Sequence, residues 1–418
     1  MKKLVTLFLC VAIVLCICPI TAFANDEVFT PEQIEYYKNL GLQGTTVNVY
    51  NWGEYISDGE DDSMDVVSEF ERLTGATVNY TNFESNENMY SKLSGGGVSY
   101  DVIVPSDYMI EKLLEENMLL PLDYDNIPNM KYIADDCLNL FFDPEQKYTV
   151  CFNVGTTVLI YNKTMVSEEP DSWSVLWDEQ YKGKVLMFNN PRDSFAIAQS
   201  LLGQNFNSTD EADWAESAKL LAEQRDNVNP VYVMDEVFNL MESGEYALCT
   251  YYAGDYLLMV ENNEDLDYCF PKEGVNFFYD AFCVPKCSKN KAGAEAFINF
   301  MHEPQVAFEN TEYIFYRSAN VTVEENEESS LYGEDVIYPT QKLKYQYFKN
   351  LPQNIIELEN SLWTQVKSGK LSVSSKQQDI KIYTECAVLA GVVLVVITAK
   401  LISNAKKKKE QDLSDLYD

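Results

Sequence analysis

Hydrophobic and polar positions along the first part of the chain follow a strand–helix–strand order. Apolar residues alternate with polar ones in Val47–Trp52, as in a half-buried strand. Apolar residues at helical spacing in Met64–Leu73, followed by Gly75, predict a helix with a glycine cap. Ala76–Phe83 is predicted to be the next strand, and Tyr100–Val104 is a continuous apolar run typical of a buried parallel strand.

The same alternation returns in the rest of the chain. Further strands are predicted at Thr156–Tyr161, Lys184–Phe188, Tyr246–Tyr252 and Phe277–Val284. Helices are predicted at Asn86–Leu93, Tyr108–Asn117, Ser174–Gln180, Ser194–Leu202, Ala292–Met301 and Tyr345–Lys367. Strands that alternate with helices through two stretches favour two α/β lobes.

An apolar run lies at each end of this region. Residues 1–24 combine an early Lys pair, an apolar stretch and Ala22-Phe23-Ala24, a pattern typical of a signal peptide. Residues 382–402 reach the length of about 20 that spans a bilayer; a buried core helix is the alternative. Because Lys406–Lys409 follow, residues 403–418 are expected to form a cytoplasmic tail. The sequence thus predicts an extracytoplasmic domain tethered to the cell membrane.

The composition of the chain argues against several kinds of partner, catalytic site and metal site. The chain has 418 residues and a formal net charge of −35, which argues against a nucleic-acid partner, because phosphate binding needs basic patches. His302 is the single histidine, which disfavours a histidine base, a catalytic triad or a histidine-rich metal site. Cys283 and Cys287 are a weak metal signal without further ligands beside them. We therefore predict no catalytic residue, metal or cofactor.

Aromatic and acidic residues gather just past the ends of the predicted strands. In an open α/β sheet, this edge is where a ligand crevice forms. Aromatic rings beside carboxylates suit a cation with an apolar body, such as a diamine. Asp280 differs from the other acids because it lies inside the apolar run Phe277–Val284, where an unpaired carboxylate would be costly. It therefore needs either a structural partner or a cationic ligand.

With these residues in view, the chain resembles the extracytoplasmic spermidine/putrescine-binding proteins of ABC transporters. The resemblance covers roughly residues 46–369. Its motifs are Tyr50-Asn51-Trp52-x-Glu54-Tyr55, Glu84-Ser85-Asn86-Glu87-x-Met89-Tyr90-x-Lys92-Leu93, Val104-Pro105-Ser106-x-Tyr108 and Phe270-Pro271-Lys272-Glu273-Gly274. It implies a type II periplasmic-binding-protein fold, with two hinged α/β lobes around a ligand cleft. We expect lobe 1 to comprise residues 45–152 and 281–318, and lobe 2 residues 153–280 and 319–370.

The resemblance also implies ligand contacts, position by position. Trp52 and Tyr55 match one aromatic wall of the channel, and Ser106 and Tyr108 match the loop that faces it. Asp280 matches the family's ammonium-binding carboxylate. The remaining implied contacts are Asp193, Tyr252, Asp255, Phe278 and Tyr316.

The chain departs from the family at several of these positions. Tyr252 and Phe278 replace tryptophans, and Asn190 replaces an acidic residue of the spermidine-preferring branch. Asp255 matches a carboxylate of the putrescine-selective branch, so putrescine is favoured over spermidine. No position was found for the glutamine that the family contributes from its C-terminal region.

The resemblance implies a monomeric binding protein that captures a polyamine by cleft closure and delivers it to an ABC permease. The chain has no Walker motif, so the permease and the ATPase are separate polypeptides. One alternative is a protein of the same fold for another solute, such as a sugar or an amino acid. A glycoside-processing enzyme also combines acids with aromatic residues in its cleft. A receptor that presents an amine to a signalling partner is disfavoured by the short tail.

Overall fold

The computed structural model describes residues 28–60 and 63–371. The predicted signal peptide (1–24), membrane span (382–402) and cytoplasmic tail (403–418) lie outside these residues. No helix in the described part of the chain is long and apolar enough to cross a membrane.

The chain passes back and forth between two compact units. Unit 1 comprises the described residues up to Val158, together with Tyr251–Glu264 and Asn276–Asn350. Unit 2 comprises Leu159–Thr250, Asp265–Val275 and the described residues from Leu351 onward. Both units contain strands and helices, as the alternation predicts.

The unit boundaries differ from those expected for the two lobes. Residues 153–158, 251–264, 276–280 and 319–350 belong to unit 1 instead of lobe 2. The physical reason is that β4 (Thr149–Asn162) and β9 (Val275–Cys283) pair antiparallel over Thr149–Thr156 and Phe277–Cys283, which keeps most of both strands together. Phe278 and Asp280 therefore lie in the same unit as Trp52 and Tyr55.

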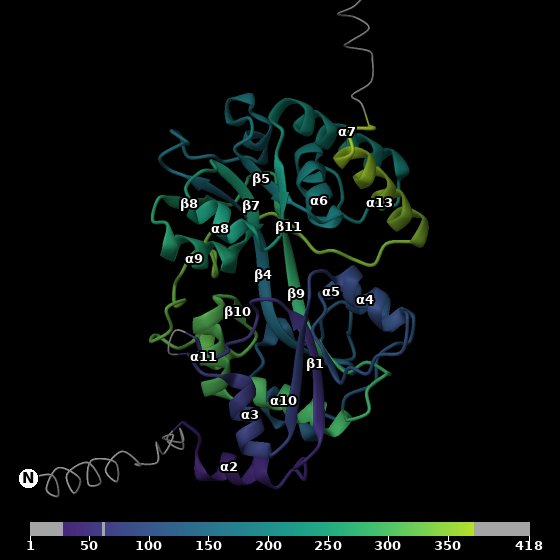
Figure 1. Cartoon of the computed structure of the whole chain (residues 1–418), viewed down its shortest axis with the longest axis vertical. Coiled ribbons are helices and arrows are strands. Elements are labelled where there is room, and N and C mark those ends of the chain that lie inside the picture. The colour runs from purple at the N-terminus through teal and green to yellow at the C-terminus, as the bar shows by residue number, and fades with distance from the viewer. Residues whose placement is uncertain (1–27, 61–62, 372–418) are drawn as a thin grey trace, which may run out of the picture. The chain divides into compact units, whose positions relative to one another are not determined.

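The sheet of unit 1 brings strand ends from distant parts of the sequence together. Its order is β2-β1-β3-β9-β4, with β1 parallel to β2 and β3, and with β9 antiparallel to β3 and β4. The bounds are Thr46–Trp52 for β1, Thr77–Phe83 for β2 and Val102–Ile103 for β3. Two short strands extend it: β10 (Arg317–Ser318) pairs with β4, and β11 (Tyr345–Gln346) pairs with β9. Figure 1 shows β4 and β9 as two long neighbouring strands.

Helices cover the sheet of unit 1. They are α2 (Pro31–Lys38), α3 (Val66–Thr74), α4 (Asn86–Ser94), α5 (Asp107–Glu115), α9 (Ala253–Asn262), α10 (Lys291–Met301), α11 (Pro304–Ile314) and α12 (Val321–Glu324). The predicted cap of α3 is confirmed, because Gly75 takes the left-handed conformation with φ 69°. Phe70 of α3 meets Phe297 and Phe300 of α10 at ring separations of 5.2 and 5.5 Å. This aromatic contact anchors both helices in the core.

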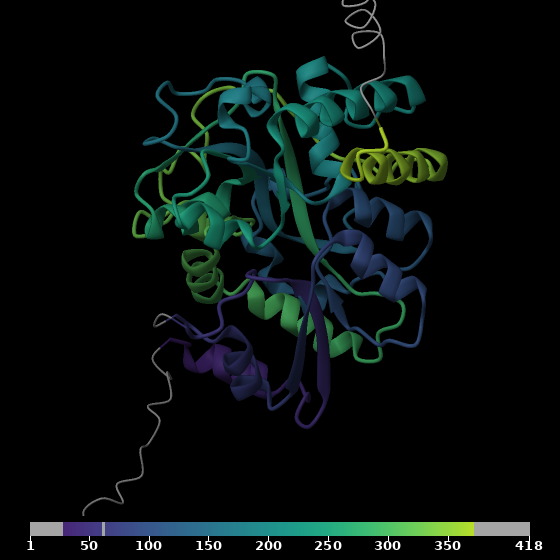
Figure 2. The same ribbon diagram turned by 45° about the horizontal axis from the view of Figure 1, so that its top comes forward.

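Unit 2 contains a second group of strands. Its strands are β5 (Val185–Phe188), β6 (Val231–Val233), β7 (Leu248–Tyr252), β8 (Leu266–Cys269) and the end of β4. Strand β5 runs parallel to β6 and β7, and β8 runs antiparallel to β4. The helices are α6 (Pro191–Leu202), α7 (Glu211–Val228), α8 (Val237–Glu242) and α13 (Gln353–Lys367). Helices α7 and α13 lie side by side in both views (Figures 1 and 2).

Three predicted elements differ from the structure. The predicted helix Tyr345–Lys367 begins only at Gln353, after Pro352, and its first two residues form strand β11. Proline is tolerated at a helix start but not inside a helix, which explains the late start. The predicted helix at Ser174–Gln180 is a pair of 3-10 turns, and the predicted strand at Thr156–Tyr161 extends back to Thr149.

Candidate ligand site in unit 1

A hydrogen bond between Tyr55 and Asp280 joins the end of β1 to the middle of β9. The chain turns after β1 at Glu54, which has φ 47°, and the turn directs Tyr55 into the unit. The hydroxyl of Tyr55 donates to Oδ2 of Asp280 at 2.8 Å, and both side chains are buried. Ser106 pairs with Asp280 from the other side as an isolated β-bridge. Strands β1, β3 and β9 thus converge on one carboxylate.

The carboxylate of Asp280 lacks a full set of hydrogen bonds. Only 3% of the residue is exposed, and Oδ1 has no hydrogen-bond partner among residues 28–60 and 63–371. Burial raises the pKa of Asp280 to about 6, although Ser106 and Tyr55 both favour the charged form. A buried carboxylate with an unused oxygen is what the sequence predicts for a site that receives a cation.

A second tyrosine–carboxylate pair lies beside the first. The hydroxyl of Tyr316 donates to Oδ2 of Asp255 at 3.0 Å, and both residues are buried. The rings of Tyr55 and Tyr316 meet edge to face, with centroids 5.0 Å apart. Burial raises the pKa of both phenols well above their ordinary value, so they remain protonated hydrogen-bond donors. The two predicted carboxylates are therefore linked through a pair of tyrosine rings.

Two glycines make room for the aromatic side chains of this region. A Cβ on Gly155 would lie 2.2 Å from Cζ of Phe278, and a Cβ on Gly254 would lie 2.6 Å from Cδ2 of Tyr316. Real Cβ atoms do not approach so closely, so both positions need glycine. The ring of Phe278 meets that of Tyr252 edge to face at 5.5 Å. The structure thus brings Tyr252 and Phe278 together on the face of β9 that carries Asp280.

The loop at the end of β3 is held by α4. Asn86 accepts a hydrogen bond from the backbone N–H of Ser106 at 3.1 Å and donates to the hydroxyl of Tyr108 at 3.2 Å. Tyr108 in turn donates to Glu87 at 2.8 Å. Ser85 caps α4 by accepting from the N–H of Asn88. The motif at residues 84–87 therefore positions the predicted Ser106–Tyr108 loop.

Trp52 lies half-buried at the end of β1. Its indole N–H donates to the carbonyl of Val104 at 2.9 Å, and its ring rests against Phe83 with centroids 4.5 Å apart. The polar edge of the indole is thus fixed by the neighbouring strand end, which sets the orientation of the ring.

Asp193 belongs to unit 2, where it takes part in a helix cap. Asn190 accepts from the backbone N–H of Asp193 at 2.8 Å and donates to its carboxylate at 2.7 Å. These reciprocal bonds close the first turn of α6. The spacing in Asn190-x-x-Asp193 therefore has a structural role, and a ligand contact by Asp193 stays a prediction.

The sequence interpretation missed Asp107 and Asn153. Asp107 is fully buried at the start of α5, and Asn153 lies opposite Asp280 on β4. Asp107 stands between two predicted contacts in Ser106-Asp107-Tyr108, which is the one signal that could have drawn attention to it. An acid in the first turn of a helix is usually exposed, so its burial has no signature in the sequence.

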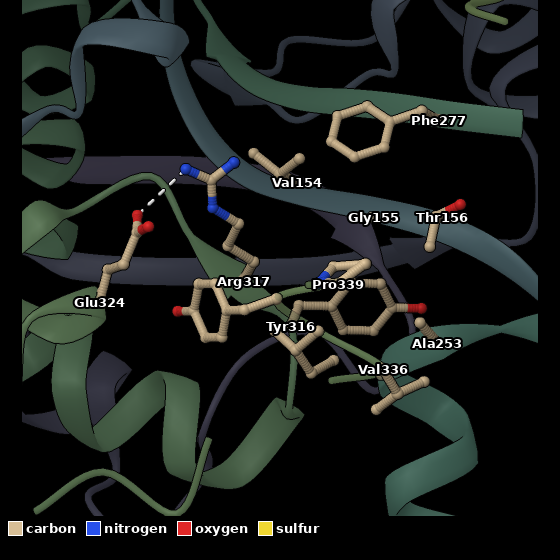
Figure 3. Close-up of a pocket in the computed structure, with 13 residues that line it drawn as sticks. Val154, Gly155, Thr156, Ala253, Phe277, Tyr316, Arg317, Glu324, Val336 and Pro339 are labelled. Carbon is tan, nitrogen blue, oxygen red and sulfur yellow. Dashed lines mark hydrogen bonds and ion pairs between the residues drawn. The ribbon is translucent and has the colours of Figure 1, made fainter. Parts of the chain in front are cut away.

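A pocket of about 310 Å³ is lined in part by residues of β4 and β9. Phe277 lines it and points to the opposite face of β9 from Phe278, since side chains alternate along a strand. Arg317 borders the pocket and pairs with Glu324 at 3.0 Å, as Figure 3 shows. Tyr316, whose hydroxyl donates to Asp255, also lines the pocket. In the part of the chain that the structure describes, no cluster of acidic, histidine and cysteine side chains is arranged to hold a metal.

Comparisons with known proteins agree with this architecture. Residues 65–340 match the family model described as bacterial extracellular solute-binding protein. The spermidine/putrescine-binding periplasmic protein 1 of Haemophilus influenzae is 31% identical over 340 residues, which cover 80% of this chain and 92% of that protein. The spermidine/putrescine-binding periplasmic protein of Escherichia coli is 32% identical over 300 residues, or 70% of this chain and 83% of that protein.

A solved structure supports the same assignment. The substrate-binding protein PotD of a spermidine/putrescine ABC transporter from Streptococcus pneumoniae superposes with a TM-score of 0.66 at 32% identity, covering 78% of this chain and 99% of that one. This chain belongs to the bacterial extracellular solute-binding protein family. Its α/β fold is of the periplasmic-binding-protein type, as the resemblance implies.

Proposed function

We propose that this chain captures a polyamine on the extracytoplasmic side and delivers it to an ABC permease. The observation that carries the proposal is the Tyr55–Asp280 pair. One oxygen of Asp280 accepts from Tyr55, and the other has no partner within the described residues. The N–H groups of an ammonium would donate charge-assisted hydrogen bonds to this second oxygen. The names of the relatives from Haemophilus influenzae and Escherichia coli support a polyamine as the ligand.

The aromatic residues suit the rest of such a ligand. Methylene groups lie well against flat rings, and a cation within about 6 Å of a ring centre is attracted to its face. Phe278 and Tyr252 form an edge-to-face pair on the Asp280 side of β9, and Tyr55 and Tyr316 form a second pair. We assign these rings to the methylene chain, with Trp52, Ser106 and Tyr108 as further contacts; a ligand contact by Asp193 stays a prediction from the resemblance.

Asp255 favours a short diamine. Its carboxylate and that of Asp280 are separated by the hydrogen-bonded rings of Tyr316 and Tyr55. Asp255 matches a carboxylate of the putrescine-selective branch in the resemblance, and putrescine is shorter than spermidine, so we favour putrescine as the ligand. Both ligands occur in the names of the relatives, among which is also a putrescine-binding periplasmic protein of Escherichia coli.

The remaining parts of the proposal rest on the sequence. The ligand drives closure of the two predicted lobes through its higher affinity for the closed form. Residues 382–402 tether the monomeric protein to the membrane, and no residue is assigned a catalytic role. A protein of the same fold for another solute, or a glycoside-processing enzyme, remains the alternative.

A thermal-shift panel tests this proposal. The full-length protein is heated with putrescine, cadaverine, spermidine, spermine, glucose, maltose or glutamine. A ligand at 100 times its Kd stabilises the folded state by about 2.7 kcal/mol, which raises the melting temperature measurably. We expect the largest rise with putrescine. A rise with a sugar or an amino acid alone would support the same-fold alternative, and cleavage of chromogenic glycosides would support the enzyme.

A further inference from the structure

Cys137 and Cys151 meet on one face of the β4–β9 pair. Cys151 of β4 is in register with Ala281 of β9, and Tyr279 lies two residues back along β9, so these side chains share a face. The hydroxyl of Tyr279 donates to the backbone carbonyl of Asp136 at 3.4 Å, which places the residue before Cys137 over the same face. The turn that carries Cys137 therefore covers the strand that carries Cys151.

Backbone hydrogen bonds fix this turn, the short 3-10 helix η4 (Asp135–Cys137), against the strand. The N–H of Ala134 donates to the carbonyl of Ala319 at 2.9 Å. The N–H of Ala319 in turn donates to the carbonyl of Phe152, also at 2.9 Å. The segments beside the two cysteines are thus connected through one residue.

The two thiols are neighbours in the core. Both cysteines are buried and reduced in the structure. Burial raises the pKa of the Cys151 thiol well above its ordinary value, and the adjacent thiol of Cys137 raises it further. Burial also raises the pKa of the Tyr279 phenol, and the nearby groups that add to this effect include Tyr347 and both thiols. The two sulfurs therefore have each other and the Tyr279 hydroxyl as neighbours.

We propose that Cys137 and Cys151 are a redox pair that forms a disulfide under the oxidising conditions outside the cytoplasm. The chain belongs to an extracellular family, and disulfides form and persist in such an environment. The bond links η4 covalently to β4, on the face of the strand pair opposite to Asp280. The inference does not require that the ligand be a polyamine.

The oxidation is a thiol–disulfide exchange with a disulfide oxidant such as glutathione disulfide. Asp135 and Asp136 are exposed, so opening of this turn brings Cys137 to the solvent first. The thiolate of Cys137 attacks the oxidant, forms a mixed disulfide and releases one glutathione thiolate. The thiolate of Cys151 then attacks the sulfur of Cys137 and displaces the second. The leaving thiolates take up the two cysteine protons, so one oxidant gives one protein disulfide and two reduced glutathiones.

A purely structural role for the two cysteines leads to a different expectation. A buried cysteine commonly acts as a small apolar residue and is chemically inert. Cys137 and Cys151 would then stay reduced in the presence of the oxidant. Cys283 is a competing partner for Cys151, because it lies two residues along β9 from Ala281 and so shares its face.

Peptide mapping by mass spectrometry tests the pair. The full-length protein is equilibrated with glutathione disulfide, its remaining thiols are blocked with iodoacetamide, and it is digested with trypsin without reduction. Cleavage after lysine places Cys137, Cys151 and Cys283 on separate peptides, which are 132–147, 148–163 and 273–286. We expect peptides 132–147 and 148–163 to be joined by a disulfide. Blocked thiols on both peptides, or a bond from 148–163 to 273–286, would overturn the proposal.

Thermal unfolding of variants provides a second measurement. The oxidised wild type should melt at a higher temperature than the protein reduced with dithiothreitol, because a disulfide restricts the unfolded chain. Cys137→Ala should lose this difference, whereas Cys283→Ala is the matched control and should keep it. An undiminished difference in Cys137→Ala overturns the pair.

The peptide map of the wild type decides alone should Cys137→Ala fail to fold. Neither readout involves a ligand. A protein that forms the disulfide but binds no polyamine would therefore overturn the proposed function and leave the redox pair intact. A protein that binds putrescine but keeps both thiols reduced in the oxidant would do the reverse.

Discussion

Tyr55 and Asp280 are 225 residues apart in the sequence and are joined by a hydrogen bond of 2.8 Å in unit 1. The bond ties the turn after β1 to the middle of β9. It leaves one oxygen of Asp280 without a partner among the residues that the structure describes. The phenol therefore fixes the carboxylate in place while the second oxygen remains open to a ligand.

Tyr55→Phe removes the hydrogen bond that favours the charged form of Asp280. The pKa of Asp280 should rise above about 6, since burial then acts with less opposition. Because only the charged carboxylate pairs with an ammonium, putrescine affinity should fall at pH 7 and recover at higher pH. Loss of a hydrogen bond to a charged group corresponds to about 1.5–3 kcal/mol. Calorimetric Kd values between pH 6 and 9 measure the effect.

Tyr90→Phe is the matched control for this experiment. Tyr90 also donates to a carboxylate in unit 1, that of Glu116 at 2.8 Å, but on the exposed surface. Its affinity profile should coincide with that of the wild type. An equal loss of affinity in both variants would contradict a specific role for Tyr55.

Gly155→Ala should displace the ring of Phe278. The added methyl group would lie 2.2 Å from Cζ of that ring, so β4 or the ring must move. Overpacking of this kind typically costs about 1–3 kcal/mol of folding free energy. Urea unfolding measures the loss of stability, and calorimetry should show weaker putrescine binding.

A compensating substitution separates packing from binding at this position. Gly155→Ala combined with Phe278→Leu relieves the overlap, so stability should return. Affinity should stay low, because the aromatic ring is missing. Wild-type stability of Gly155→Ala alone would contradict the close packing of Gly155 against Phe278.

His302 should make the protein less stable in mild acid. Burial lowers the pKa of His302 to about 3 from its ordinary 6.5, so the folded protein keeps this imidazole neutral. Between these two values the unfolded chain binds a proton that the folded protein does not. The contribution of His302 to stability is therefore fully present above pH 6.5 and falls as the pH drops toward 3, by up to about 1.4 kcal/mol per pH unit.

His302→Leu tests this pH dependence. The variant keeps the acid sensitivity of the many carboxylates but loses the part that comes from the imidazole. Urea unfolding at pH 7, 6 and 5 should show a smaller decline for the variant than for the wild type. Parallel declines would show that His302 does not titrate on unfolding.

The sequence predicted helices and strands better than it predicted contacts between residues that are distant along the chain. The strand that ends at Trp52 and the helix capped by Gly75 follow from local periodicity and turn chemistry, and both are present. The contact between Tyr55 and Asp280 has no local signal, because it depends on the pairing of β3 with β9. The resemblance to polyamine-binding proteins placed both residues in one site, whereas the pattern of apolar and polar positions did not.

The features that the sequence analysis predicted wrongly or missed also have physical causes. Tyr345 and Tyr347 lie in the range predicted to be helical, but their rings both pack against Phe277, with centroids 5.3 and 5.8 Å away. Residues two apart share a face only in an extended chain, so this packing favours a strand there. The burial of Asp107 likewise depends on how α5 meets β9. Both features arise from tertiary packing, which overrides local preference.

Asp280→Asn tests the central claim most directly. The variant keeps the shape of the side chain and the contact with Tyr55 but removes the charge. Calorimetric titration of the full-length protein with putrescine and spermidine should show saturable binding by the wild type and a loss of about 2–5 kcal/mol in the variant, as when one partner of a buried charge pair is removed. Unchanged affinity in Asp280→Asn, with wild-type folding, would contradict the account.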